Sequence, residues 1–334
     1  MNTENLIAHT IEGNELSMAQ SEMLFDSIFD GKISQVELAA ILAAMKVRRE
    51  KPQEISGAIK SMRKFAVSLP IAESVFDTCG TGGDHSHSFN ISSAVAIILN
   101  AMGYPIAKHG NRSVTSKSGS ADFYEALHIP VNLSGQDAVR YFNRNKFIFL
   151  FAPNYHPAMK HAAPVRKQLG VRTIFNFLGP LTNPLNPKRQ MIGVFHPSFL
   201  EVYAQAALPL GYERMVLYSS ANGMDEVSPV HPTIVTEIAG NTINTFTINP
   251  EKFIAKDEAH LLPHNLAPQE NAHAFIETIN STTPTPLSKL LSLNAALALY
   301  VLDYSQSIEK NFETALECIH SGTVAHTLLK LQES

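Results

Sequence analysis

Two loops in the first half of the chain carry residues suited to binding a phosphorylated ligand. The first reads Gly80-Thr-Gly-Gly-Asp84, and a helical pattern begins shortly after it, near Ile91. Glycines let backbone N–H groups approach an anion because no Cβ obstructs them, and the amino end of a helix also favours an anion. A plain strand-to-helix turn, with Asn90 or Ser92 as an N-cap, would use the same residues. The loop matches neither the P-loop nor the dinucleotide fingerprint, so alone it leaves both interpretations open.

The second loop runs from Lys108 to Lys117 and continues to Asp122. It combines lysines, an arginine, glycines and several hydroxyl groups. Lys108 as a point charge and Arg112 as a bidentate fork could neutralise phosphate charge. The alternative is a solvated polar loop with an ordinary helix start at Ser120. Because both loops follow short apolar strands in adjacent strand–loop–helix units, the pair favours a phosphorylated substrate.

A pair of carboxylates, Asp225-Glu226, follows the apolar stretch Met215–Tyr218. Open α/β sheets bind ligands outside the carboxyl ends of their strands. Magnesium prefers oxygen ligands and is typically held by one or two carboxylates together with substrate phosphates. A solvated acidic turn is the commoner role of such a pair, so the pair alone is weak support for a metal site.

The segment His156–Arg166 contains two histidines, a lysine and an arginine. His156 and His161 do not have the i, i+4 spacing of a zinc-binding helix. We therefore do not expect zinc here, and we expect His161 to be packed or capping. Arg166 is the residue of interest, because a guanidinium can clamp a carboxylate.

The first 70 residues contain helical patterns only, and these predict a small helical domain. Apolar residues recur at three- and four-residue spacing in Met18–Ile28, Val36–Lys46 and Pro52–Phe65. Ser34, with Glu37 three residues later, fits a capping box at the start of the second helix.

From about residue 71 onwards, short apolar strands alternate with helical stretches. The predicted strands are Val75–Thr78, Ile106–Lys108, Phe147–Ala152, Met191–Phe195 and Met215–Tyr218, followed by a hairpin of Thr233–Ile238 and Thr242–Ile248. The predicted helices include a stretch from about Ile91, then Asp122–Leu127, Pro157–Leu169, Phe199–Leu210 and a helical end over Pro286–Leu331. This alternation predicts an α/β domain over residues 71–334, with a mostly parallel sheet flanked by helices. Helices near 157–185 could pack with the helical domain, residues 1–70.

Composition narrows the class of protein. The chain has 334 residues, 45% hydrophobic and 17% charged, with a net charge of −4. We expect a globular enzyme, not a nucleic-acid-binding polycation. Two cysteines, no signal peptide pattern and no membrane-length apolar run favour a cytoplasmic protein without a membrane partner. Yet residues 85–121 and 138–200 contain no acidic residue, and a locally cationic centre suits a small anionic ligand.

Five segments, taken in this order and spacing, resemble the anthranilate phosphoribosyltransferases, a family of nucleoside-phosphorylase-like phosphoribosyltransferases. The matching segments are DTCGTGGD, SFNISS, AKHGNRSVTSKSGSAD, FAPNYHPAMKHAAPVRKQLGVRTIFNFLGPLTNP and GMDE. The helical start also resembles the family's N-terminal domain, so the resemblance covers nearly the whole chain. It implies transfer of a phosphoribosyl group from phosphoribosyl pyrophosphate to anthranilate in tryptophan biosynthesis. It also implies Mg²⁺ as cofactor and a homodimer formed through the helical domain.

The resemblance also implies residue roles. Phosphoribosyl pyrophosphate would be held by Gly80, Gly83, Asp84, Ser88, Asn90, Ile91, Ser92, Ser93, Lys108, His109, Gly110, Asn111, Arg112, Ser113, Val114, Thr115, Ser116 and Ser120. Magnesium would be organised by Ser92, Asp225 and Glu226. Anthranilate would contact Gly80, Asn111 and Arg166, with Arg166 on its carboxylate. Lys108, Asn111 and Arg166 are the expected catalytic residues.

The sequence departs from the family pattern in two places. Ser219-Ser-Ala-Asn-Gly223 stands where a His-Gly pair is usual, and Ser93 stands where Thr is common. Neither change removes a charge, so only contacts from the 219–223 loop are put in doubt. Two other functions share this architecture: a pyrimidine nucleoside phosphorylase and a non-catalytic nucleic-acid-binding paralogue. The GTGGD loop and the Asp225-Glu226 pair argue against the first, and the intact loop and negative charge against the second.

Overall fold

The computed structural model describes residues 2–82, 88–113 and 117–333. Its first part is a bundle of four helices: α1 (Thr3–Ile11), α2 (Met18–Phe29), α3 (Gln35–Arg48) and α4 (Pro52–Lys64). The predicted capping box is present: Glu37 N donates to Ser34 Oγ at 3.3 Å, and Ser34 N donates to Glu37 Oε2 at 2.8 Å. The buried carboxylate of Glu54 accepts hydrogen bonds from Leu16 N, Lys51 N and Arg48 Nη2, which ties the bundle's loops to α4.

The second part is built on a sheet of seven strands in the order β3-β2-β1-β4-β5-β6-β7. The strands are β1 (Phe76–Gly80), β2 (Ile106–Gly110), β3 (Phe147–Phe151), β4 (Arg189–Gly193), β5 (Arg214–Ser220), β6 (Thr233–Ala239) and β7 (Thr242–Ile248). The pairs among β1–β5 are parallel, and β6 and β7 add as an antiparallel hairpin. The predicted fold class, a helical part followed by a mostly parallel sheet flanked by helices, is confirmed.

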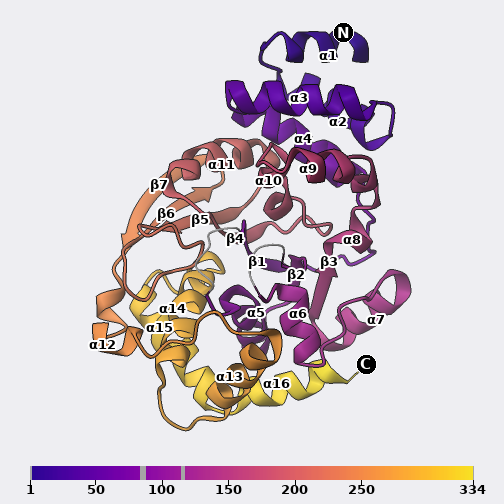
Figure 1. The fold of residues 1–334 in the computed structure, drawn as a ribbon. Helices are drawn as coiled ribbons and strands as arrows, with labels where there is room; N and C mark the ends of the chain where they lie inside the picture. The colour runs from indigo at the N-terminus through magenta and orange to yellow at the C-terminus, as the bar shows by residue number, and fades with distance from the viewer. Residues whose placement is uncertain (1, 83–87, 114–116, 334) are drawn as a thin grey trace.

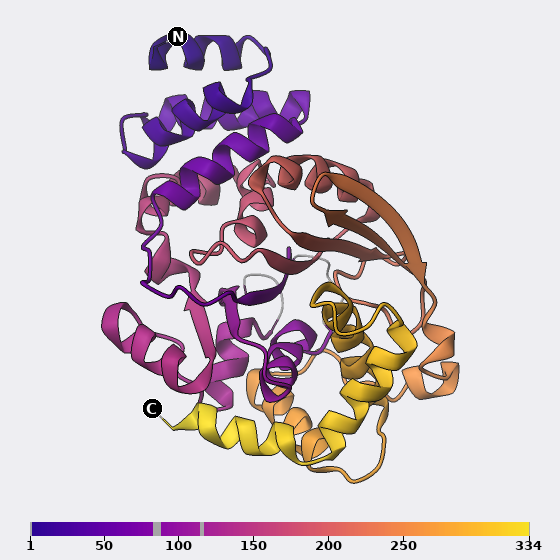
Figure 2. The ribbon, with the colours of Figure 1, turned by 180° about the vertical axis from the view of Figure 1, so that it is seen from behind.

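Helices cover both faces of this sheet, as Figures 1 and 2 show from opposite sides. On one face lie α9 (Ala163–Leu169), α10 (Phe175–Leu178) and α11 (Leu200–Ala207), with the N-terminal bundle beyond them. On the other face lie α5 (Ile91–Ala101), α6 (Ser120–Ala126), α7 (Gly135–Asn145), α13 (Pro268–Asn280), α14 (Pro286–Val301), α15 (Ile308–His320) and α16 (Thr323–Gln332). Two short α-helices remain: α8 (Ala152–Tyr155), which follows β3, and α12 (Lys256–Ala259), which follows β7.

Side chains alternate along the strands and so divide the interior into two cores. Ile192 and Leu217 pack in the core shared with the N-terminal bundle, whereas Met191 and Val216 pack in the core with α5 and α14. Because successive strand residues point to opposite faces, both cores are filled from the same strands.

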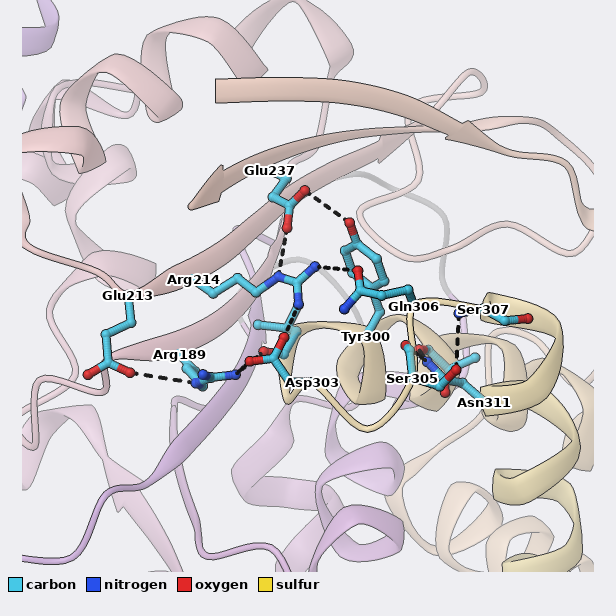
Figure 3. A network of polar contacts seen from close by, with 12 residues as sticks. Arg189, Glu213, Arg214, Glu237, Tyr300, Asp303, Ser305, Gln306, Ser307 and Asn311 are labelled. Atoms are coloured by element: carbon cyan, nitrogen blue, oxygen red, sulfur yellow. Dashed lines mark hydrogen bonds and ion pairs between the residues drawn. The ribbon is translucent and has the colours of Figure 1, made fainter. Parts of the chain in front are cut away.

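A polar network fixes α14 to the amino ends of two strands (Figure 3). Arg214, at the start of β5, donates to Glu237 Oε1 at 2.6 Å and also pairs with Asp303, just past α14. Asp303 pairs with Arg189 at the start of β4 as well, and Tyr300 donates to Glu237 Oε2 at 3.0 Å. The network therefore lies at the opposite end of these strands from their carboxyl termini.

Several predicted helices are interrupted in the structure. The helix expected over Pro157–Leu169 is a 3₁₀ turn, Pro157–His161, followed by α9, because Pro164 cannot donate a helical hydrogen bond. The stretch Phe199–Leu210 ends as α-helix at Ala207, close to Pro209, and finishes as 3₁₀. The C-terminal stretch is three helices, α14–α16, and no prediction was made for α7 or α13.

Candidate active site

A cavity of about 630 Å³ opens at the carboxyl ends of β1 and β2. The strand order reverses between β1 and β4, and ligands of open α/β sheets bind in the crevice at such a point. The predicted residues that line it are Gly80, Ser88, Asn90, Ser92, Ser93, Lys108, His109, Gly110, Asn111, Arg112, Ser113, Ser120, Arg166, Asp225 and Glu226. Gly83, Asp84, Val114, Thr115 and Ser116 lie outside the described residues. Most of the predicted site residues that the structure describes thus meet in one place.

Ile91 is the predicted site residue, among those described, that does not line this cavity. It is the first residue of α5, and its side chain is fully buried in the core. Its backbone N–H donates to Phe89 O at 2.7 Å. Ile91 therefore stands at the start of α5 with its side chain in the core, and its predicted contact with the ligand stays a prediction.

Two glycines let the Asp225 loop lie directly against the sheet. Gly80 and Gly193 are paired across β1 and β4 at the carboxyl ends of these strands. A Cβ on Gly193 would lie 1.6 Å from Asp225 O, and a Cβ on Gly80 would lie 2.5 Å from Asp225 Oδ2. A Cβ at Gly193 would displace the Asp225 backbone, and one at Gly80 would displace its carboxylate, so glycine at both positions lets the carboxylate lie at the glycine-rich loop.

The Asp225 and Glu226 carboxylates bridge the glycine-rich loop and α5. Gly82 N donates to Asp225 Oδ2 at 2.8 Å, and Ser92 N donates to Glu226 Oε1 at 3.2 Å. Both carboxylates are 7% exposed and line the cavity. With the Ser92 hydroxyl, which also borders the cavity, they form a set of hard oxygen donors that fits magnesium.

The described residues supply part of such a metal site. Within residues 2–82, 88–113 and 117–333, no three His, Cys, Asp or Glu side chains gather to hold a metal ion. A magnesium ion beside Asp225 and Glu226 would therefore take further oxygens from substrate phosphates or water, as is usual for this ion.

Lys108 brings a buried positive charge to the floor of the cavity. The side chain is 2% exposed, and its Nζ donates to Thr78 O and, at 3.3 Å, to Ser92 Oγ. Asp77 lies beneath it, fully buried, and accepts hydrogen bonds from His109 N at 3.2 Å and Asn183 Nδ2 at 2.9 Å. Burial raises the pKa of Asp77 to about 6, against the opposing effect of the Lys108 charge.

Arg112 differs from Lys108 in that its charge is already balanced. It borders the cavity, but its guanidinium pairs with Asp122 at 2.8 Å and Glu125 at 2.6 Å. Its expected contact with phosphate would require these ion pairs to be shared or exchanged.

A second cavity of about 660 Å³ adjoins the first and extends towards the helical bundle. Gly80, Asn111 and Arg166 line both cavities. Arg166 lies on α9 with its guanidinium 5.1 Å from the centre of the Phe175 ring, and partial burial lowers its pKa. A partly desolvated cation beside an aromatic ring is suited to an aromatic carboxylate.

Two histidines border the second cavity as neutral rings. The His109 and His156 rings meet edge to face, with centroids 5.1 Å apart. Burial lowers the pKa of His109 to about 3 and that of His156 to about 4. His161, in contrast, packs against Gly31 of the helical bundle, where an added Cβ would lie 2.6 Å from its ring.

The 219–223 segment, where the sequence departs from the family pattern, forms a tight turn. Gly223 has φ +83°, its N–H donates to Ser220 O at 2.8 Å, and Ser220 N donates to Met224 O at 3.0 Å. Ser220 Oγ donates to Glu226 O at 2.7 Å. The serine therefore helps to shape the backbone that carries the two carboxylates.

Three residues that the sequence analysis did not single out support the site. Asn183 and Gln190 both donate to Asp77 Oδ2 at 2.9 Å, and Arg172 lines the first cavity. Asn183 and Gln190 are far from Asp77 in sequence, and no local motif marks them. Arg172 belongs to the acid-free segment 138–200, but that segment did not indicate which of its basic residues would line the cavity.

The fold and the two joined cavities define an α/β protein with a glycine-lined, cationic cavity at the switch point of its sheet and a second cavity, bordered by Arg166, beside it. Two family profiles match the chain: the glycosyl transferase family helical bundle domain over residues 4–66, and the glycosyl transferase family a/b domain over residues 72–325. The anthranilate phosphoribosyltransferase of Ignicoccus hospitalis is 38% identical over 100% of this chain and 98% of its own length. That of Laribacter hongkongensis is 39% identical over 97% of this chain and 95% of its own length.

Solved structures agree with these relatives. The anthranilate phosphoribosyltransferase from Thermus thermophilus superposes with a TM-score of 0.90 at 32% identity, covering 98% of both chains. The Saccharomyces cerevisiae enzyme in complex with PRPP and Mg has a TM-score of 0.85 at 26% identity, covering 98% of this chain and 97% of its own. The chain therefore belongs to the anthranilate phosphoribosyltransferase family of glycosyl transferases.

Proposed function

We propose that this enzyme transfers the phosphoribosyl group of phosphoribosyl pyrophosphate to anthranilate, giving N-(5-phosphoribosyl)anthranilate and pyrophosphate. One observation carries the assignment of the two substrates. Gly80, Asn111 and Arg166 stand at the junction of a cationic, glycine-lined cavity and a second cavity with aromatic and imidazole walls. A sugar pyrophosphate in the first and an aromatic acid in the second would meet at these residues.

The first cavity is suited to stabilising a leaving pyrophosphate. The anomeric carbon loses the oxygen of pyrophosphate and gains the aromatic amine nitrogen, through an oxocarbenium-like state. The buried Lys108 ammonium and the backbone of the glycine-rich loop would stabilise the negative charge that develops on the departing group. The amine proton becomes acidic as the C–N bond forms, so no dedicated general base is required.

We further propose that Ser92, Asp225 and Glu226 hold magnesium together with substrate oxygens. The ion would supply charge stabilisation for the pyrophosphate group. Their shared cavity and oxygen donors support this assignment, as does the complex of the yeast relative with PRPP and Mg.

The test of the reaction uses the fluorescence of anthranilate. Addition of phosphoribosyl pyrophosphate and Mg²⁺ to enzyme and anthranilate should consume the fluorophore, and omission of either should leave it unchanged. Consumption without phosphoribosyl pyrophosphate, or none in the complete mixture, would refute the proposal.

The metal assignment has its own test. In the double variant Asp225→Asn, Glu226→Gln, the Mg²⁺ concentration for half-maximal rate should rise about tenfold or more, since the site loses both carboxylates. Asp257→Asn with Glu251→Gln, on the exposed surface around α12, changes charge equally and serves as control. A wild-type magnesium titration in the first variant would remove the metal role from this pair.

We also propose that the chain forms a homodimer through its helical part, with residues 1–70 and 71–334 as two domains. A face of α3 supports the dimer: Val36 and Val47 are 81% and 87% exposed, and Ala40 and Ala43 lie between them on the same side of the helix. A second copy of the chain could cover this self-complementary apolar stripe.

Sedimentation tests the dimer directly. Wild-type chain should sediment as a dimer, and Val36→Glu with Val47→Glu should sediment as a monomer that keeps its helical circular dichroism. Leu329→Glu, on the exposed side of α16, should remain dimeric. A monomeric wild-type chain, or a dimeric double variant, would contradict an interface on α3.

A further inference from the structure

A third cavity, of about 530 Å³, lies between the end of α3, the segment that leads into α10, and α11. It has no part in the reaction proposed above. Arg172 and Asn176 line both this cavity and the first substrate cavity. The two spaces are therefore neighbours that share a wall.

The inner wall of the third cavity is aromatic. Phe199 stands at its centre, with ring centroids 5.6 Å from Phe177 and 4.8 Å from Phe195. Tyr203 adds a fourth ring, 5.1 Å from Phe177. Such a wall can pack against the face or edge of a planar aromatic ligand.

The rim of the cavity is cationic. Lys46 and Arg49, at the end of α3, are exposed, and Arg172 lies with its guanidinium 3.7 Å from the centre of the Phe195 ring. Among the described residues that line the cavity, Glu50 is the one acidic side chain. The excess of positive charge next to aromatic rings suits a ligand that combines an aromatic ring with a carboxylate.

One buried polar atom in the lining also calls for a partner. Thr173 is 2% exposed, and its hydroxyl has no hydrogen-bond partner within the described part of the chain. Because this hydroxyl is closed to solvent, a ligand in the cavity could bond to it only if the side chain turned towards the cavity.

From these contacts we propose that the third cavity is a separate binding site for a small aromatic carboxylate. The aromatic wall would hold the ring, and Lys46 and Arg49 would hold the carboxylate. Two sources of this chemistry are possible, a second molecule of the aromatic acid substrate or an aromatic amino acid. Glu50 would pair with the ammonium group of the latter.

The site is connected to the glycine-rich loop by a short path. Phe195 forms part of the aromatic wall, and its backbone N–H donates to Thr81 Oγ1 at 3.0 Å. Thr81 stands between Gly80 and Gly82, and its own N–H donates to Gly193 O at 2.9 Å. A ligand that shifts Phe195 would thus alter the loop proposed to hold phosphoribosyl pyrophosphate. This coupling rests on the proposed function, whereas binding itself does not.

Binding can be measured without turnover on the full chain. The chain contains no tryptophan but nine tyrosines, so L-tryptophan excited at wavelengths that tyrosine does not absorb can be followed without protein background, and anthranilate is the second probe. Anthranilate is titrated in Arg166→Ala, so that the proposed substrate site does not contribute to its binding. We expect saturable binding of at least one probe, weakened tenfold or more when Lys46→Glu and Arg49→Glu are added. The matched double reversal Lys310→Glu, Lys330→Glu, on exposed faces of α15 and α16, should bind as wild type. Glu50→Gln should weaken L-tryptophan selectively if the amino acid is the ligand.

Coupling is measured as a change in the KM for phosphoribosyl pyrophosphate when L-tryptophan is the added probe, because anthranilate is itself a substrate in the assay. This change should occur in wild type and disappear in Lys46→Glu, Arg49→Glu, whose activity without probe should stay within about twofold of wild type. Two results would overturn the site: no saturable binding of either probe, or binding that survives the charge reversal and is lost in Arg166→Ala. Failure of the transfer reaction would refute the proposed function but would leave the binding result intact.

Discussion

At the scale of single residues, buried charges in the site depend on neighbours that are remote in sequence. Lys108 is almost fully buried, and its charge acts on the buried carboxylate of Asp77. Asp77 is in turn held by the amides of Asn183 and Gln190. A buried charge is tolerated when it is hydrogen-bonded and compensated, so these amides help to maintain the charge that faces the ligand.

Arg166→Ala should raise the KM for anthranilate by roughly ten- to a hundredfold, with a smaller effect on the KM for phosphoribosyl pyrophosphate. The lost contact is a charge-assisted hydrogen bond to a carboxylate, worth about 1.5–3 kcal/mol. Steady-state kinetics with each substrate varied in turn would measure both constants. Lys167→Ala, on the exposed side of α9, is the control and should change neither. An unchanged KM for anthranilate, with weakened phosphoribosyl pyrophosphate binding, would assign Arg166 to the other substrate.

Local motifs predicted the residues that touch the cavities, but not those that hold them. Lys108 is near the end of β2, Asn111 follows that strand, and Asp225 lies in the loop after β5. These segments have an unusual composition, and the end of a parallel strand points to a known edge of the sheet. Asn183 and Gln190 act through contacts made only when β1 and β4 pair. Arg112 shows the reverse case, since its charge is visible in the sequence but its ion pairs with Asp122 and Glu125 arise from the packing of the loop on α6.

At the scale of elements, the carboxyl ends of β1 and β4 determine how closely the Asp225 loop can approach. Gly80 and Gly193 face each other in register, and the loop passes over both. The glycine-rich composition after β1 predicted that this strand end would lie at the ligand. Nothing in the local sequence of β4 indicated that Gly193 faces Asp225, because that contact depends on strand order.

Gly193→Ala should therefore displace the Asp225 backbone and weaken magnesium use, although residue 193 carries no functional group. The added Cβ would lie 1.6 Å from Asp225 O, so the loop must move. We expect a stability loss of about 1–3 kcal/mol, as for other overpacked sites, and a rise of about tenfold in the Mg²⁺ needed for half-maximal rate. Urea unfolding and magnesium titration of the rate would measure the two effects.

Gly179→Ala provides the comparison, since a Cβ there meets nothing within 4 Å. That variant should keep the magnesium titration of wild type. If Gly193→Ala also titrates as wild type, the position of the Asp225 loop does not control the metal.

Helix boundaries were less predictable than strands for a physical reason. Apolar periodicity continues through Pro157–Leu169, yet Pro164 divides the segment into a 3₁₀ turn and α9. The hairpin of β6 and β7 was predicted well, because Ala239-Gly240-Asn241 marks the turn and Gly240 has φ +57°.

At the scale of the whole molecule, one sheet separates two cores. The helical bundle belongs to the core that also packs under the second cavity. His109 and His156 are buried at this junction as neutral rings. Their protonation would place a charge on a buried ring, in the case of His109 close to the Lys108 charge, so the stability of the molecule should depend on pH.

Stability should fall as the pH is lowered from 7 to 5. The pKa of His109 is lowered to about 3 and that of His156 to about 4, so the unfolded chain takes up protons below its histidine pKa of about 6.5 while the folded chain does not. Each histidine then contributes a loss of about 2 kcal/mol at pH 5. Asp77 acts in the opposite sense, because its pKa is raised to about 6 and its folded form gains a proton in this window. Its protonation stabilises the folded chain by roughly 1.4 kcal/mol at pH 5. The net loss in the free energy of unfolding is then roughly 2–3 kcal/mol.

Urea unfolding of the ligand-free chain at pH 7, 6 and 5 measures this dependence. His156→Gln cannot be protonated, so it should remove about 2 kcal/mol of the net loss, which is most of the pH slope, even if its stability at pH 7 is lower than that of wild type. His273→Gln, whose side chain is 73% exposed, should keep the wild-type slope. An unchanged slope in His156→Gln would mean that the ring is protonated in the folded chain. The His156 ring at the second cavity would then be cationic at mildly acidic pH, not neutral.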